Sequence, residues 1–160
     1  ASAPVFAGAQ INPFGLTGGK NPSFADLDGD GDMDLMAQST LLGYWYLYYS
    51  ENIGTASAPA FAAAQINPFG IPGLYFADPA FADLDADGDF DLMVGGYEDF
   101  CYFQNIGTVS APAFATVQIN PFGLSSVYYS TPTFADVDGD GDMDLMSGSL
   151  GQYNNKKYYF

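Results

Sequence analysis

The chain has 160 residues but no histidine, a single cysteine and only three basic side chains, all of them lysine. Without histidine, and with Cys101 lacking a basic partner, it offers no recognisable pair of nucleophile and base, and no serine lies in a nucleophile context. We therefore expect that the chain is not an enzyme. Three lysines against 19 acidic residues also make nucleic acid and anionic membranes unfavourable partners.

Long apolar runs are missing as well. No stretch approaches the roughly 20 residues of a membrane-spanning helix, so we expect no membrane insertion, and no signal peptide is recognisable. The chain begins at Ala1 without methionine, which favours a processed or excerpted chain. A lone cysteine cannot form an internal disulfide. The sequence does have 48% hydrophobic and 17% aromatic residues, which excludes disorder and suffices for the core of one domain.

Most acidic residues gather in three nine-residue loops, 26–34, 83–91 and 136–144, with aspartate at every odd position of each loop. The loops hold 15 of the 19 acidic residues, so the net charge of −16 reflects local sites rather than a broad acidic surface. Five neighbouring carboxylates repel one another, whereas Ca²⁺ prefers about six to eight oxygen ligands. The alternative, a solvated acidic turn, would have to occur three times. The predicted metal site residues are Asp26, Asp28, Asp30, Asp32, Asp34, Asp83, Asp85, Asp87, Asp89, Asp91, Asp136, Asp138, Asp140, Asp142 and Asp144.

Each loop position has a predicted role. The side chains at positions one, three, five and nine are the expected ligands, position seven adds its backbone carbonyl, and the glycine at position six allows the sharp turn. An EF-hand would need a bidentate glutamate at position twelve, where this chain has Ala37, Val94 and Ser147. The apolar flanks are short, so we expect each loop to join two strands rather than two helices.

Other motifs repeat in step with the loops. The segment 10–15 recurs at 65–70 and 118–123, the segment 52–61 recurs at 105–114, and the loops start 57 and 53 residues apart. Such a period is typical of propellers, solenoids and arrays. No helical periodicity is present, so the predicted fold class is all-β. For the first period we expect strands over 23–26, 33–38, 44–49 and 60–66, and a turn at 67–70.

The repeat divides a single domain, 1–160, into units. We expect the fourth strand of a shared unit within 1–15, complete units over 16–70 and 71–123, and a partial unit over 124–160. The opening Ala1–Pro4 matches Ala56–Pro59, and the closing Tyr158–Phe160 matches Cys101–Phe103, so the third unit stops after its third strand. Cys101 thus takes the place of a strand tyrosine, which favours a buried thiol over a reactive one.

The run from Phe24 to Leu35, with the later Tyr-x-x-Asn-x-Gly turn, resembles FG-GAP-like, or VCBS-type, calcium-binding β-propeller repeats. Integrin α-subunit heads and certain fungal lectins carry related repeats. The resemblance covers essentially the whole chain. It implies four-stranded antiparallel blades with one Ca²⁺ in each loop, three in total, between the first and second strands. One departure matters, because propellers close with about four or more blades and this chain encodes three.

Three blades leave unpaired strand edges. We expect an N-terminal strand, from the same chain or from a neighbouring one, to complete the third blade. Exchange between chains would give a homo-oligomer that closes into a ring or grows into a filament. The alternative is an excerpt of a longer propeller protein.

The expected function is an extracellular, calcium-stabilised structural or adhesive protein, since weak Ca²⁺ loops fill where the ion is millimolar. One alternative is a lectin on the same scaffold, whose aromatic run Tyr44–Tyr49 would stack on glycans. Another is a non-catalytic propeller of a longer secreted protein. Strand geometry sends Tyr44, Tyr46 and Tyr48 to one face and Trp45, Leu47 and Tyr49 to the other. We expect one face to be core and the other an interface, in preference to a ligand platform, because aromatic side chains dominate the buried area of both.

Overall fold

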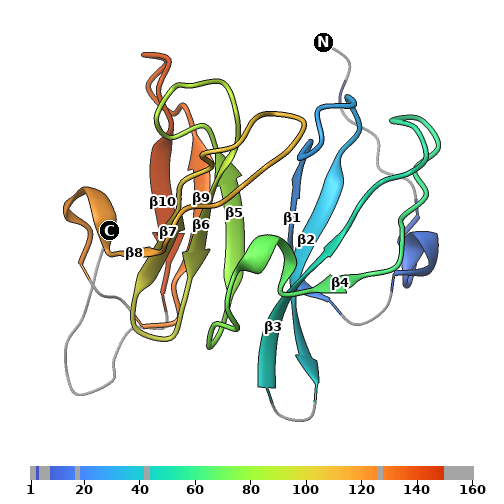
Figure 1. Ribbon diagram of the computed structural model, residues 1–160, viewed down its shortest axis with the longest axis horizontal. Helices are drawn as coiled ribbons and strands as arrows, with labels where there is room; N and C mark the ends of the chain where they lie inside the picture. Colours follow the sequence, from blue (N-terminus) through green and yellow to red (C-terminus); the bar gives the residue numbers. More distant parts are fainter. Residues whose placement is uncertain (1–2, 4–7, 17–18, 42–43, 126–127, 150–160) are drawn as a thin grey trace.

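Residues 3, 8–16, 19–41, 44–125 and 128–149 are described by the computed structural model of the chain. They form ten strands in three antiparallel sheets, with three short 3₁₀ turns (Figure 1). Two sheets have four strands, in the orders β1-β2-β3-β4 and β5-β6-β7-β8, and the third pairs β9 with β10. We call them the first, second and third blade. No helix within the described ranges is long and apolar enough to cross a membrane.

The elements follow the sequence repeat, and the all-β prediction is confirmed. The first blade has β1 (Lys20–Ala25), β2 (Asp34–Leu41), β3 (Tyr44–Ser50) and β4 (Gln65–Ile66). The second has β5 (Asp78–Ala82), β6 (Asp91–Gly95), β7 (Phe100–Phe103) and β8 (Gln118–Ile119). The third has β9 (Thr131–Ala135) and β10 (Asp144–Gly148). The Pro-Phe-Gly turns form η1 (Pro13–Gly15), η2 (Pro68–Gly70) and η3 (Pro121–Gly123).

The predicted fourth strand over 60–66 is wrong for most of its length, because only Gln65–Ile66 pairs with β3. The side chain of Asn52 explains the difference. Its Oδ1 accepts hydrogen bonds from the backbone N–H groups of Ala60 (3.0 Å) and Gly54 (3.1 Å). Ala60 therefore bonds to a side chain instead of joining a ladder, and Phe61 keeps only an isolated bridge to Asn52.

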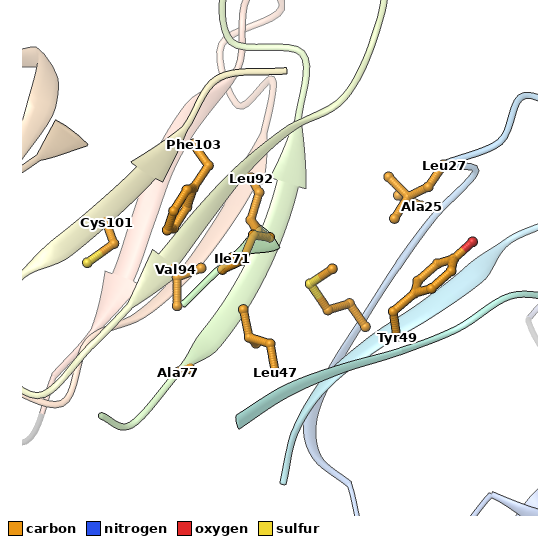
Figure 2. Packing of buried hydrophobic residues seen from close by; sticks show 11 residues of the cluster. Ala25, Leu27, Leu47, Tyr49, Ile71, Ala77, Leu92, Val94, Cys101 and Phe103 are labelled. Carbon is orange, nitrogen blue, oxygen red and sulfur yellow. The ribbon is translucent and has the colours of Figure 1, made fainter. Parts of the chain in front are cut away.

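The first and second blades pack face to face, with side chains alternating between the two faces of each sheet. Met36, Leu47 and Tyr49 of the first blade are buried against Leu92 and Val94 of the second. Figure 2 shows Leu47 and Tyr49 on one side of this core and Cys101 and Phe103 on the other. We call the side of each sheet that carries the strand-two methionine its back face and the opposite side its front face. The back-face methionines are Met36, Met93 and Met146, and the front-face leucines beside them are Leu35, Leu92 and Leu145.

The second and third blades repeat this arrangement. Met93 and Tyr102, on the back face of the second blade, are buried, and Phe134 of β9 packs against them from the front face of the third blade. The first and second blades thus each offer the back face to the front face of the next blade along the chain.

The aromatic strand β3 contributes buried side chains on both of its faces. Tyr48 packs with Leu35 and Ala37 on the front face, whereas Leu47 and Tyr49 belong to the core behind. The predicted division of this strand between two faces is confirmed. The thiol of Cys101, at the position of Tyr48 in the next blade, is buried as predicted, and burial with the nearby charge of Asp99 raises its pKa to about 11.

The expected strand at the end of the chain, residues 158–160, lies outside the described residues, as do 1–2 and 4–7 of the expected N-terminal strand. Residues 8–16 contain η1 but no strand, and Ile11 is exposed. The equivalent residues Gln65–Ile66 form β4 by pairing with the third strand of their blade, β3. Residues 10–11 would therefore need to pair with the third strand of a blade to form the predicted strand.

Candidate metal centre

Each aspartate loop joins the first strand of a blade to its second, as predicted. The loop backbone wraps around its first carboxylate. Asp26 accepts hydrogen bonds from the N–H groups of Gly29 (2.8 Å), Asp30 (3.1 Å) and Gly31 (3.0 Å). The position-six glycine has φ of 92° in the first loop, 94° in the second and 101° in the third, a conformation that favours glycine. The predicted role of this glycine is confirmed.

The loops bring several of the predicted carboxylates together. In the first and second loops the side chains at positions one, three and five offer oxygens that all lie within 4.8 Å of one another. In the third loop the corresponding group combines positions one, three and nine. The three groups are Asp26, Asp28 and Asp30, then Asp83, Asp85 and Asp87, and finally Asp136, Asp138 and Asp144.

The ninth aspartate anchors the loop to the sheet in the first blade. Asp34 is buried, and its Oδ1 accepts a hydrogen bond from the N–H of Asn52 at 2.7 Å. Its Oδ2 accepts bonds from the Tyr49 hydroxyl at 3.0 Å and the Leu27 N–H at 3.2 Å. One carboxylate thus links the loop, the third strand and the following hairpin.

The same anchor recurs in the second blade, around Asp91. Its partners are the Asn105 N–H at 2.7 Å, the Tyr102 hydroxyl at 2.9 Å and the Leu84 N–H at 3.2 Å. In the third blade the Val137 N–H donates to Asp144 at 3.0 Å. Ligand chemistry alone did not find the tyrosine and asparagine partners. Their signal is the Tyr-x-x-Asn-x-Gly turn, which recurs after the second strand in both blades and keeps the spacing between the tyrosine and the asparagine.

Comparison with protein families gives two matches, both to the FG-GAP-like repeat, over residues 26–94 and 83–147. Together they span more than half of the chain. The chain belongs to the FG-GAP-like repeat family. The resemblance inferred from the motifs is thereby confirmed. Comparisons with curated proteins and with solved structures gave no match.

Electrostatics inside the FG-GAP loops disfavour a cluster of fully charged carboxylates. Burial is the main cause that raises the pKa of Asp28, Asp89 and Asp91, and neighbouring carboxylates raise each of them further. For Asp91, hydrogen bonds from Asn105, Tyr102 and Leu84 oppose the increase. In the third loop the backbone N–H of Asp142 donates to Asp140 at 3.1 Å, and this bond, with a second one between the two side chains, lowers the pKa of Asp140. The bond between the side chains and the charge of Asp140 raise the pKa of Asp142.

One aspartate of the second FG-GAP loop tests directly whether the loop residues fit a metal ion. Asp89, at position seven, is only 8% exposed, and its Oδ1 is buried without a hydrogen-bond partner among the described residues. A buried, unpaired carboxylate oxygen is unfavourable unless a proton or a cation compensates it. Three converging carboxylates beside it supply the oxygen ligands that a hard cation requires. The residues of the loop therefore fit a calcium ion.

Proposed function

We propose that this chain is a calcium-stabilised structural repeat protein that binds one Ca²⁺ in each of its three loops. The observation that carries the proposal is the convergence of carboxylate oxygens, within 4.8 Å of one another, in all three loops. The side chains at positions one, three, five and nine would hold the ion, with the backbone carbonyl at position seven. The bound ion would supply positive charge where five carboxylates otherwise repel one another.

The ligand chemistry favours calcium over softer metals. The loops offer carboxylate and carbonyl oxygen, whereas zinc sites in proteins are usually built from cysteine and histidine. The chain has no histidine, and its one cysteine is buried in the core between the blades. We assign no catalysis to the loops, because a carboxylate held by Ca²⁺ is a poor general acid.

Structural support is the role that this arrangement serves best. In the first and second blades the ion would stabilise a loop whose ninth aspartate also holds the third strand and the next hairpin, so ion binding and blade stability are linked there. We place the protein outside the cell, where millimolar calcium fills weak sites. There it would act in assembly or adhesion, through completion of the third blade by a strand of a neighbouring chain.

Calorimetric titration with Ca²⁺ tests this function. We expect about three bound ions per chain and a higher unfolding temperature, which a chelator reverses. Asp28→Asn should remove one site, whereas Glu98→Gln, outside the loops, should leave all three. Absence of calcium binding by the folded chain would reject the proposal.

A lectin is the second candidate, favoured by a cluster of aromatic rings at the start of β3. Trp45 packs on Phe76 at 4.3 Å between ring centroids, and Tyr75 and Tyr97 continue the contacts. A cavity of about 240 Å³ beside them is lined by Glu98 and Asp99, whose carboxylates could accept sugar hydroxyls. Glycan-array binding that Trp45→Ala abolishes and Tyr44→Ala preserves would support the lectin.

A further inference from the structure

The residue that follows the third strand differs in charge between the first and second blades. It is Glu51 in the first blade and Gln104 in the second, and each stands directly before the asparagine whose N–H donates to the ninth aspartate. The backbones match here, because the carbonyl of Glu51 accepts a hydrogen bond from Ala62 at 2.8 Å and that of Gln104 accepts one from Ala115 at 2.8 Å. We call this place the flanking position of the loop. Its side chains therefore start from equivalent points in the two blades.

In the second blade the flanking side chain reaches the aspartate loop. The Nε2 atom of Gln104 donates a hydrogen bond to Oδ2 of Asp85 at 2.7 Å. Asp85 is the position-three aspartate, one of the three whose oxygens converge within 4.8 Å of one another. A carboxylate that accepts one hydrogen bond keeps lone pairs for an ion. A neutral amide thus holds one of the predicted calcium ligands of this loop.

In the first blade the flanking position carries a negative charge instead. An ionised glutamate only accepts hydrogen bonds, so Glu51 cannot hold the position-three aspartate, Asp28, as the amide does. Its charge nevertheless acts on this residue. Burial is the main cause that raises the pKa of Asp28, and neighbouring charges, including that of Glu51, raise it further. The first loop therefore has an additional carboxylate beside its five aspartates, where the second loop has an amide.

We propose that Glu51 sets the calcium affinity of the first loop, by adding its negative charge to the ion on the side of Asp28. The first loop then binds Ca²⁺ more tightly than the second, where Gln104 takes the same place. Calcium loops in proteins differ in affinity with the number of charged groups around the ion. The inference rests on the calcium binding in the proposed function and names a residue that tunes it.

The charge of Glu51 has opposite consequences with and without the ion. Without calcium it repels the carboxylates of the loop and lowers the stability of the folded chain. With calcium it attracts the ion, so the same charge favours the bound state. Gln104 behaves differently, because its hydrogen bond to Asp85 holds the ion-free loop and adds no charge. A side chain with a purely structural role would not show such a reversal.

Two reciprocal substitutions in the full 160-residue chain test the inference. Calcium buffers set the free Ca²⁺ concentration, and the amide NMR signals of the position-six glycines, Gly31, Gly88 and Gly141, report the three loops separately. In the unchanged chain, Gly31 should respond at a lower calcium concentration than Gly88. Glu51→Gln should weaken binding at the first loop by about tenfold, and Gln104→Glu should strengthen binding at the second by a similar factor.

Unfolding temperatures provide a second measurement on the same variants. In chelator, Glu51→Gln should raise the unfolding temperature because it removes a repulsion, whereas the increase produced by calcium should be smaller than in the unchanged chain. Gln104→Glu should lower the unfolding temperature in chelator, since it loses the hydrogen bond to Asp85. Glu98→Gln is the matched control. It removes the same charge from an exposed residue outside the loops and should leave all three affinities unchanged.

Several results would overturn the inference. One is a Glu51→Gln variant whose first loop binds calcium within about twofold of the unchanged chain. Another is a loss of affinity that all three loops share and that Glu98→Gln reproduces, since this would be a general effect of net charge. Three bound ions with unchanged affinities in both reciprocal variants would reject only this inference. A folded chain that binds no calcium would reject the proposed function together with it.

Discussion

The second and third blades contain the same strand-two motif, Asp-Leu-Met, yet they are buried to very different degrees. All five residues of β6 are buried, whereas none of the five residues of β10 is. The second blade has a neighbour on each face, and the third has one on its front face within the described part of the chain. Within the sheets, β6 lies between β5 and β7, whereas β10 pairs only with β9 in the described part of the chain. Burial of this motif thus depends on neighbouring strands and neighbouring blades more than on the composition of the strand.

The largest expected effect on stability comes from shortening the strand-two methionines of the second and third blades. Met93→Ala should lower the free energy of unfolding by about 2–5 kcal/mol, because it opens a cavity in the core between the second and third blades. Met146→Ala should change it by less than about 0.5 kcal/mol in the monomer, since that side chain is exposed. Urea unfolding in calcium, below the concentration at which copies associate, measures both. Equal effects would mean that the third blade is covered within a single chain.

The second effect concerns the hydrogen bonds that join the ninth aspartate of a loop to its sheet, which the structure describes in full for the first and second blades. Tyr102→Phe should lower the free energy of unfolding by about 1.5–3 kcal/mol, because its hydroxyl donates to the buried Asp91 carboxylate at 2.9 Å. The exposed Tyr44 provides a control, and Tyr44→Phe should have an effect below about 0.5 kcal/mol. Thermal unfolding of both variants tests the difference. The loss should shrink at low pH if protonation of Asp91 already weakens the bond.

A smaller effect compares the second and third loops at position four. Ala86 has φ of 61°, in the left-handed region, while the equivalent Gly139 has φ of 79°. Ala86→Gly should therefore stabilise the protein by up to about 1 kcal/mol, and Gly139→Ala should destabilise it by a similar amount. Space around Gly139 is open, so its effect is conformational alone. Chemical unfolding in calcium measures both changes, and a stabilising Gly139→Ala would contradict this account.

The repeat, the loops and the first three strands of the first blade were predicted well from the sequence, because each of these is local. Five aspartates in nine residues, a glycine at position six and a Pro-Phe-Gly turn define a conformation with little help from the rest of the chain. The predicted alternation of Tyr48 and Tyr49 between the two faces of the strand is confirmed for the same reason, since strand geometry fixes it.

Features that depend on distant partners were not visible in the sequence. The fourth strand was predicted too long because the side chain of Asn52 captures the N–H of Ala60. Likewise, nothing local distinguishes Met93 from Met146, whose burial depends on the next blade in the stack. The role of Asp34 as a structural anchor needed the position of Tyr49, fifteen residues away in the chain.

Stability should change with pH in opposite directions with and without calcium. This difference, the smallest effect expected, tests whether the loop carboxylates hold the ion. Burial raises the folded-state pKa of Asp28, Asp89 and Asp91 above the ordinary value of 3.8. In chelator, their contribution to stability is therefore fully present below pH 3.8 and is lost as the pH rises through the raised values. Acidification from pH 7 should then stabilise the ion-free protein. In calcium the same change should destabilise it, because protons compete with the ion for the carboxylates. Unfolding temperatures across this range, with and without chelator, should give slopes of opposite sign for the unchanged chain. If the slope has the same sign with and without chelator, the carboxylates do not hold the ion.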